Sequence, residues 1–132
     1  MTDFEIEFYK TENGDIPILD FVQSLDIKMK AKVLRCVDIL KKNGNELREP
    51  YTKSLGNGIF ELRAKQGSDI GRVLYFFVIG RKIVLTNGFM KKTQKTPKRE
   101  IRKAKAERDD WINRKGVRNM ATWTDYKKPY QG

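Results

Sequence analysis

The side chains best suited to phosphate chemistry gather between residues 88 and 105. Lysines, an arginine and small hydroxyls crowd residues 88–100, where the pattern predicts the end of a strand and the start of a helix. Free N–H groups at a helix start add positive potential where a phosphate can sit. Phe89 is suited either to stacking on a base there or to packing in the core. We predict nucleic-acid contacts for Phe89, Lys95, Lys98, Arg99, Arg102, Lys103 and Lys105.

A second group pairs two arginines on neighbouring strands. Arg63 and Arg72 lie at comparable distances from the turn expected at residues 67–69, so a hairpin would place their side chains next to each other. Two guanidinium groups on one sheet face make a bidentate phosphate clamp. The alternative is a structural ion pair of either arginine with Glu61. Tyr75 falls on the opposite strand face from Arg72, and we expect it in the core.

Positive charge is concentrated in one part of the chain. The 132 residues carry 28 Lys and Arg against 17 Asp and Glu, a net charge of +11. Residues 81–108 hold 11 of the basic and 2 of the acidic side chains, whereas residues 1–80 hold 12 of each. A field focused in this way is typical of a protein that binds a polyanion, most often nucleic acid. The alternative is a solvated lysine-rich surface.

The composition also excludes several kinds of site. The chain has no histidine, which excludes His-based triads and His metal sites. Its single cysteine, Cys36, forms neither an internal disulfide nor a thiolate zinc site, so we expect a reducing compartment. The acidic first residues lack the features of a signal peptide, and the longest apolar run, residues 73–79, is far shorter than the roughly 20 residues of a membrane helix. We expect a cytoplasmic protein that contacts no membrane.

The remaining patterns predict the elements that carry these residues. Strands are expected at residues 3–9, 59–65, 71–79 and 82–90, helices at 17–25, 27–43 and from 97 onward, and a loop at 45–58. The strand at 71–79 is apolar on both faces, which indicates a central position. The order predicts an α+β fold with a small, mainly antiparallel sheet, an N-terminal helical hairpin, a C-terminal helix and the helices on one side of the sheet. We expect one domain, residues 1–115, and a loosely attached tail, residues 116–132.

Three segments also carry a family resemblance. The stretches at residues 60–63, 72–77 and 88–97, the last including Lys-Lys-Thr-Gln-Lys-Thr-Pro, resemble the HigB-type, phage-derived branch of the RelE/ParE toxin superfamily. The resemblance extends over residues 3–115. It implies a RelE-like fold and a toxin of a type II toxin–antitoxin system. Such a toxin cleaves mRNA on the ribosome without metal or cofactor, and a helix-turn-helix antitoxin neutralises it.

The resemblance also implies roles for individual residues. Arg72 matches the arginine that RelE-like toxins aim at the scissile phosphate, and Lys91 and Lys92 match the basic pair near the leaving oxygen or the transition state. Arg63 matches a catalytic basic position and Lys65 an RNA-binding one, both approximately. Neither tyrosine nor histidine lies between residues 91 and 100, so the general base stays unassigned. We expect Arg72→Ala to abolish toxicity and to leave the fold intact, because a surface arginine seldom decides stability.

Electrostatics suffices for much of the expected chemistry, because RNA supplies its own 2′-OH nucleophile. One of Lys91, Lys92 or Lys95 is a candidate proton donor or acceptor. Two other classes of function stay open. The same fold hosts ParE-like proteins that inhibit DNA gyrase without cutting RNA, although such chains generally lack a dense basic face like that at residues 91–102. The other class is a non-catalytic nucleic-acid-binding module.

Overall fold

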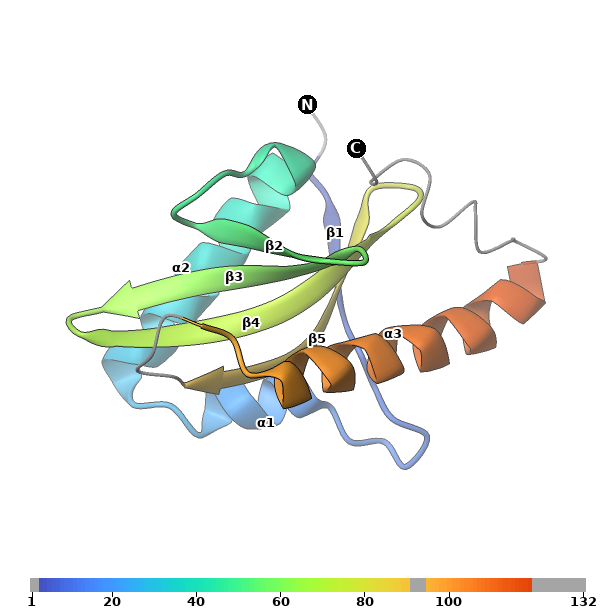
Figure 1. Cartoon of the computed structure of the whole chain (residues 1–132), viewed down its shortest axis with the longest axis horizontal. Helices are drawn as coiled ribbons and strands as arrows, with labels where there is room; N and C mark the ends of the chain where they lie inside the picture. The colour runs from blue at the N-terminus through green and yellow to red at the C-terminus, as the bar shows by residue number, and fades with distance from the viewer. Residues whose placement is uncertain (1–2, 91–94, 120–132) are drawn as a thin grey trace.

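The computed structural model describes residues 3–90 and 95–119. Within them a five-stranded sheet has the strand order β1-β5-β4-β3-β2 (Figure 1). Its strands are β1 (Glu5–Phe8), β2 (Thr52–Gly56), β3 (Ile59–Gln66), β4 (Asp69–Val78) and β5 (Lys82–Met90). β1 pairs in parallel with β5, and the other neighbours are antiparallel. The α+β class, the mainly antiparallel sheet and the central position of β4 are confirmed.

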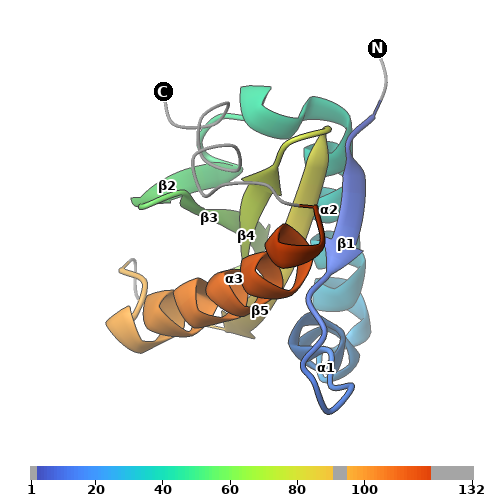
Figure 2. The same ribbon diagram turned by 90° about the vertical axis from the view of Figure 1, so that its right-hand side faces the viewer.

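Helices cover both faces of this sheet, so the prediction that they lie on one side is wrong. Figure 2 shows α2 (Ile27–Asn43) and α3 (Lys98–Asn119) on opposite sides of the strands. The reason lies in β4, whose alternating side chains belong to two separate apolar cores. Val73, Tyr75 and Phe77 belong to the core beneath α2, whereas Leu74, Phe76 and Val78 belong to the core that Ala104 and Trp111 of α3 complete.

The expected N-terminal helical hairpin is not confirmed, because β1 comes first and the two helices that follow pack mainly against different strands. α1 (Pro17–Gln23) lies against β5, and α2 lies mainly against β3. Pro17 occupies the first turn of α1, as expected. Asp26 caps α2, where its side chain accepts a hydrogen bond from the Met29 backbone N–H at 2.8 Å.

Two glycines allow the close approaches that this packing needs. Gly44 follows α2 with a φ of 53°, at the start of the 3₁₀ helix η1 (Gly44–Glu46). A Cβ at Gly44 would come within 2.1 Å of the Phe4 ring, and a Cβ at Gly88 within 2.3 Å of the Phe21 ring. The ring of Phe21 therefore packs directly on the backbone of β5, and α1 is held close to the sheet.

The segment that precedes β3 contains a strand that the sequence pattern does not predict. β2 pairs antiparallel with β3, and Thr52 lies opposite Leu62. The loop expected at residues 45–58 is therefore wrong in its second half. β2 is an edge strand that exposes most of its side chains, so it lacks the apolar alternation that marks half-buried strands.

Polar contacts join the second half of α3 to β1 and to the residue that follows it. The Tyr9 hydroxyl donates a hydrogen bond to Asp110 Oδ2 at 2.7 Å, and the Trp111 indole N–H donates one to Glu7 Oε2 at 2.5 Å. The hydrogen bond from Tyr9 holds the pKa of Asp110 below its usual value, and burial raises the pKa of Tyr9 to about 12. The helix continues to Asn119, past residue 116, where the sequence pattern places the start of the tail. The rest of that tail lies outside the described residues.

Candidate active site

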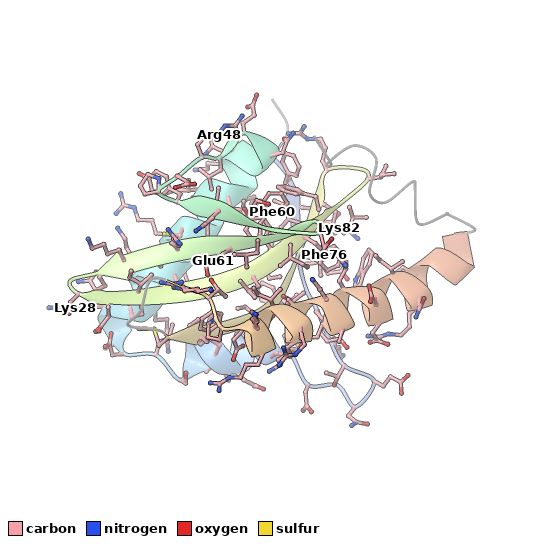
Figure 3. All side chains as sticks on the ribbon, in the orientation of Figure 1. Lys28, Arg48, Phe60, Glu61, Phe76 and Lys82 are labelled. Atoms are coloured by element: carbon pink, nitrogen blue, oxygen red, sulfur yellow. The ribbon has the colours of Figure 1, made fainter. Side chains whose placement is uncertain are left out.

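The candidate site is built around one buried carboxylate. Glu61 on β3 is completely buried on the α3 side of the sheet (Figure 3). Its Oε1 accepts a hydrogen bond from Arg63 Nε at 2.8 Å, and its Oε2 lies 3.3 Å from Arg72 Nη1. The Thr96 hydroxyl, just before α3, also donates to Oε2. Glu61 thus joins two strands and the segment that leads into α3.

The register of the hairpin explains why the two arginines meet. Arg63 lies directly opposite Arg72 in the antiparallel pair of β3 and β4, so both side chains point to the same face. The predicted adjacency of the two arginines is therefore confirmed. So is the alternative of a structural ion pair, because both guanidinium groups contact the Glu61 carboxylate. Neighbouring guanidinium groups repel each other, and the shared carboxylate offsets that repulsion.

The two arginines differ in how far their side chains are buried. The Arg72 side chain is 1% exposed, and Arg72 Nη1 also donates to Thr96 Oγ1 at 3.4 Å. The expectation of a surface arginine at residue 72 is therefore wrong, because Thr96 and the start of α3 cover this part of the sheet. Removing a buried charged partner affects stability strongly, so Arg72→Ala will not leave the fold intact. Arg63 is 20% exposed at its side chain and is the member of the pair that reaches solvent.

Exposed lysines flank Arg63 on the same sheet face. Lys65 lies two residues along β3, and Lys53 on β2 lies opposite Glu61 in the register. Lys53 is a candidate that the sequence reasoning missed, because β2 was expected to be loop. The Gly-Asn-Gly sequence at residues 56–58 is the signal for a hairpin turn that would have placed Lys53 on a strand. All three residues have positive φ angles in the structure.

The other predicted residues divide into three groups. Phe89 lies opposite Arg72 and packs half-buried against the core beneath α3, which places it beside the site with limited exposure. Lys91 and Lys92 lie outside the described residues. The remaining predicted contacts lie just before α3 or on its first two turns, where all are exposed except the half-buried Lys105: Lys95, Lys98, Arg99, Arg102, Lys103 and Lys105.

A comparison with protein families shows the family of this chain. Residues 20–109 match the family described as Phage derived protein Gp49-like (DUF891). The chain belongs to the Gp49-like family. This family comprises RelE/HigB-like toxins of toxin–antitoxin systems, so the Gp49-like chain is related to such toxins and an antitoxin is the partner that the family suggests. A search of curated proteins finds no match.

The matched region of this Gp49-like chain contains β2 to β5 and the first half of α3, and thus the whole Glu61 cluster. Across residues 3–90 and 95–119, no three Cys, Asp or Glu side chains gather where they could hold a metal ion. Over the same residues, no helix is both long and apolar enough to cross a membrane.

One acidic group of the Gp49-like chain stands apart from the cluster. Glu107 on α3 is 8% exposed, and its Oε1 accepts no hydrogen bond from the described residues. Burial raises the pKa of Glu107 to about 7; the charge of Lys103 opposes this rise and that of Glu100 adds to it. The folded protein therefore holds a proton on Glu107 between about pH 4.5 and 7, whereas the unfolded chain releases it there.

This difference predicts a pH-dependent effect of Glu107→Gln. The raised pKa stabilises the fold fully below pH 4.5, and this contribution is lost as the pH rises through 7. Glutamine stays neutral throughout, so the variant should match the wild type at pH 4 and exceed its free energy of unfolding by about 3 kcal/mol at pH 8. Urea unfolding at both pH values measures this. The exposed Glu12→Gln serves as control, and an equal response of both variants would contradict the assignment.

Proposed function

We propose that this protein is a HigB-type toxin of a type II toxin–antitoxin system that cleaves mRNA on the ribosome. Membership of a toxin family supports the biological role. The observation that carries the chemistry is the arginine at residue 63, whose guanidinium is anchored at 2.8 Å by a buried carboxylate while 20% of its side chain is exposed. A cation fixed in this way is prepared for a phosphate before the substrate arrives.

The proposed reaction uses the RNA 2′-OH as nucleophile. Its oxygen attacks the adjacent phosphorus, the bond to the 5′ oxygen breaks, and the products are a 2′,3′-cyclic phosphate and a free 5′-OH. Arg63 binds the non-bridging oxygens of this phosphate, with Lys65 and Lys53 contacting neighbouring phosphates. Lys91 and Lys92 stabilise the charge that develops in the transition state. The general base stays unassigned, and no metal or cofactor takes part in the proposal.

Arg72 receives a different role from the one that the resemblance implies. Its buried guanidinium holds Glu61 and Thr96, and Glu61 in turn holds Arg63. We therefore propose Arg72 as a positioning residue. The cations at the start of α3 bind ribosomal RNA, and this binding holds the site against the mRNA. The proposed location of the reaction is the cytoplasm. A helix-turn-helix antitoxin is the proposed partner that blocks this activity.

Mapping of mRNA 5′ ends in cells that express the protein tests the proposal. We expect cuts in phase with codons for the wild type and for Lys42→Ala, which alters an exposed ion pair on α2. Arg63→Ala should lose the cuts while keeping its fold, because its guanidinium is only partly buried. A DNA-damage response without cuts would instead indicate gyrase inhibition. Absence of both would indicate a non-catalytic nucleic-acid-binding module.

A further inference from the structure

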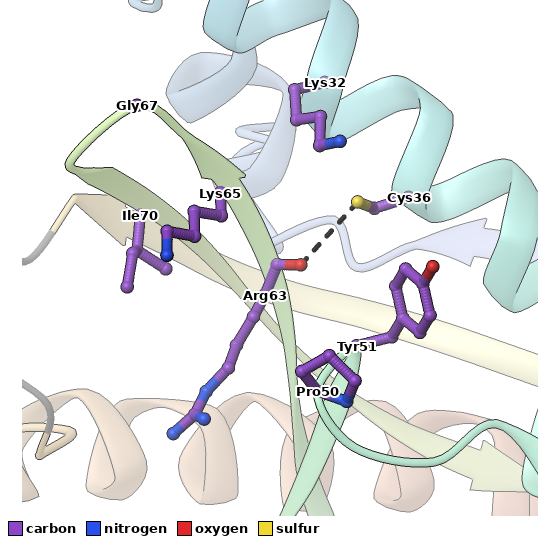
Figure 4. A pocket seen from close by; sticks show the side chains of 8 residues that line it. All are labelled: Lys32, Cys36, Pro50, Tyr51, Arg63, Lys65, Gly67 and Ile70. Carbon is purple, nitrogen blue, oxygen red and sulfur yellow. Dashed lines mark hydrogen bonds between the residues drawn. The ribbon is translucent and has the colours of Figure 1, made fainter.

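A cavity of about 550 Å³ opens beside the candidate active site, between α2 and the edge of β3 (Figure 4). α2 forms one side of its wall, and the residues just before β2 form the second. The end of β3, the turn that follows it and the start of β4 form the third. The lining residues are Lys32, Cys36, Pro50, Tyr51, Arg63, Lys65, Gly67 and Ile70.

The cavity exists because β2 covers only part of β3. β2 begins opposite Leu62, so residues 63–66 extend beyond its start. The Arg63 backbone N–H donates to the Tyr51 carbonyl at 2.8 Å, and its carbonyl accepts from Cys36 Sγ at 3.6 Å. Backbone groups two residues apart on a strand point the same way, so the N–H and C=O of Lys65 also face this edge. The edge thus adds polar groups to the cavity wall.

The lining has the composition of a nucleotide site. Lys32, Arg63 and Lys65 are cations, and no lining residue is acidic. Tyr51 is 45% exposed, so its ring is accessible for a base to stack on it. The volume lies within the range of small-molecule sites. Cations for a phosphate and an aromatic ring for a base favour RNA over a protein segment as the occupant.

The cavity and the candidate active site share one residue, Arg63. Arg63 lines it and at the same time holds the Glu61 carboxylate, and its side chain points away from Cys36 (Figure 4). Lys65 lies on the same strand two residues further along. RNA that crosses the edge of β3 would therefore place one phosphate at Arg63 and the neighbouring nucleotide in the cavity.

We propose that this cavity is a nucleotide-binding subsite, in which a base stacks on Tyr51 and its phosphate contacts Lys32 and Lys65. The inference rests on the proposed function, because the subsite would hold the nucleotide next to the scissile phosphate. It assigns substrate contacts to α2 and to the segment before β2. Both lie outside the basic region at residues 81–108.

Titration of the ¹⁵N-labelled full-length protein with AMP and, separately, with inorganic phosphate tests the subsite. AMP should shift the amide signals of Lys32, Tyr51, Lys65 and Gly67. Tyr51→Ala should weaken AMP binding by about 5- to 150-fold, the range that stacking of one base is worth, and Tyr51→Phe should preserve it. Lys32→Ala should weaken binding of both AMP and phosphate. Lys28→Ala, one turn earlier on α2 and outside the cavity, is the matched control and should change neither.

Three results would overturn the subsite: no shifts with AMP, equal binding of AMP by wild type and Tyr51→Ala, or shifts of these amides only when a partner protein binds. The mapping of mRNA cuts keeps this inference separate from the proposed function. AMP binding at Tyr51 in a protein that makes no cuts would reject the ribonuclease and retain the nucleotide site. Cuts by a protein whose cavity does not respond to AMP would reject the nucleotide site and retain the ribonuclease.

Discussion

Glu61→Gln is expected to lower the free energy of unfolding by about 3–5 kcal/mol, because the variant leaves a buried guanidinium without its counter-ion. Arg72 is 1% exposed and lies directly opposite Arg63. The Glu61 carboxylate lies within 3.3 Å of both guanidinium groups. A neutral amide would leave two adjacent positive charges in a site with little solvent to screen them. Chemical denaturation of the purified variant measures the loss.

The matched control removes an acidic charge from an exposed ion pair. Asp38→Asn breaks the contact with Lys42, in which both side chains are more than half exposed, and should cost at most about 1 kcal/mol. The double variant Glu61→Leu/Arg72→Leu should recover much of the lost stability, since an apolar pair can replace a buried ionic one. It should nevertheless lack cleavage, because Arg63 has lost its anchor. A Glu61→Gln protein as stable as Asp38→Asn would contradict this account.

Replacement of both Lys91 and Lys92 by methionine is expected to lower the cleavage rate about 100-fold or more while changing ribosome affinity much less. Interactions that form only in the transition state raise the rate without tightening the ground-state complex. Loss of one such charge or donor typically costs a factor of about 100–1,000. Single-turnover cleavage on programmed ribosomes at saturating protein isolates this rate from binding.

Lys98→Met/Arg102→Met is the matched comparison, because both side chains are exposed cations at the start of α3. A docking role for this pair predicts weaker ribosome binding, with a near-normal rate once the protein is bound. The ribosome affinity of this variant should also fall less steeply with salt than that of the wild type, since fewer phosphate contacts release counterions. Equal behaviour of the two double variants would show that catalytic and docking lysines are not separate groups.

The sequence allowed much of the sheet to be predicted and little of the burial. The turn at residues 67–69 sets the register of β3 and β4, so the adjacency of Arg63 and Arg72 follows from local pattern alone. The burial of Arg72 depends on α3, which lies more than 20 residues further along the chain. The apolar residues on both faces of β4 did indicate that the strand is buried on both sides. They did not indicate which helix would cover which face.

The cavity was even less accessible to sequence reasoning. Lys32, Tyr51 and Lys65 come from a helix, a loop and a strand end, and no spacing rule relates them. Their proximity follows from the position at which β2 begins, and β2 itself has no clear strand pattern. Edge strands are exposed on most of their surface, so apolar alternation does not identify them. Tertiary pairing alone brings these three residues together.

The alternation of β4 between two cores also restricts how the gene can change. Insertion of one codon within the first half of this strand would turn every following side chain toward the opposite face. Tyr75 and Phe77 would then face α3, and Leu74 and Phe76 would face α2. Each core would receive side chains whose sizes and shapes fit the other core. A codon added in the turn at Gly67 and Ser68 lies outside both strands and leaves the alternation intact. Selection should therefore tolerate length variation at this hairpin tip and remove it within the strand that follows.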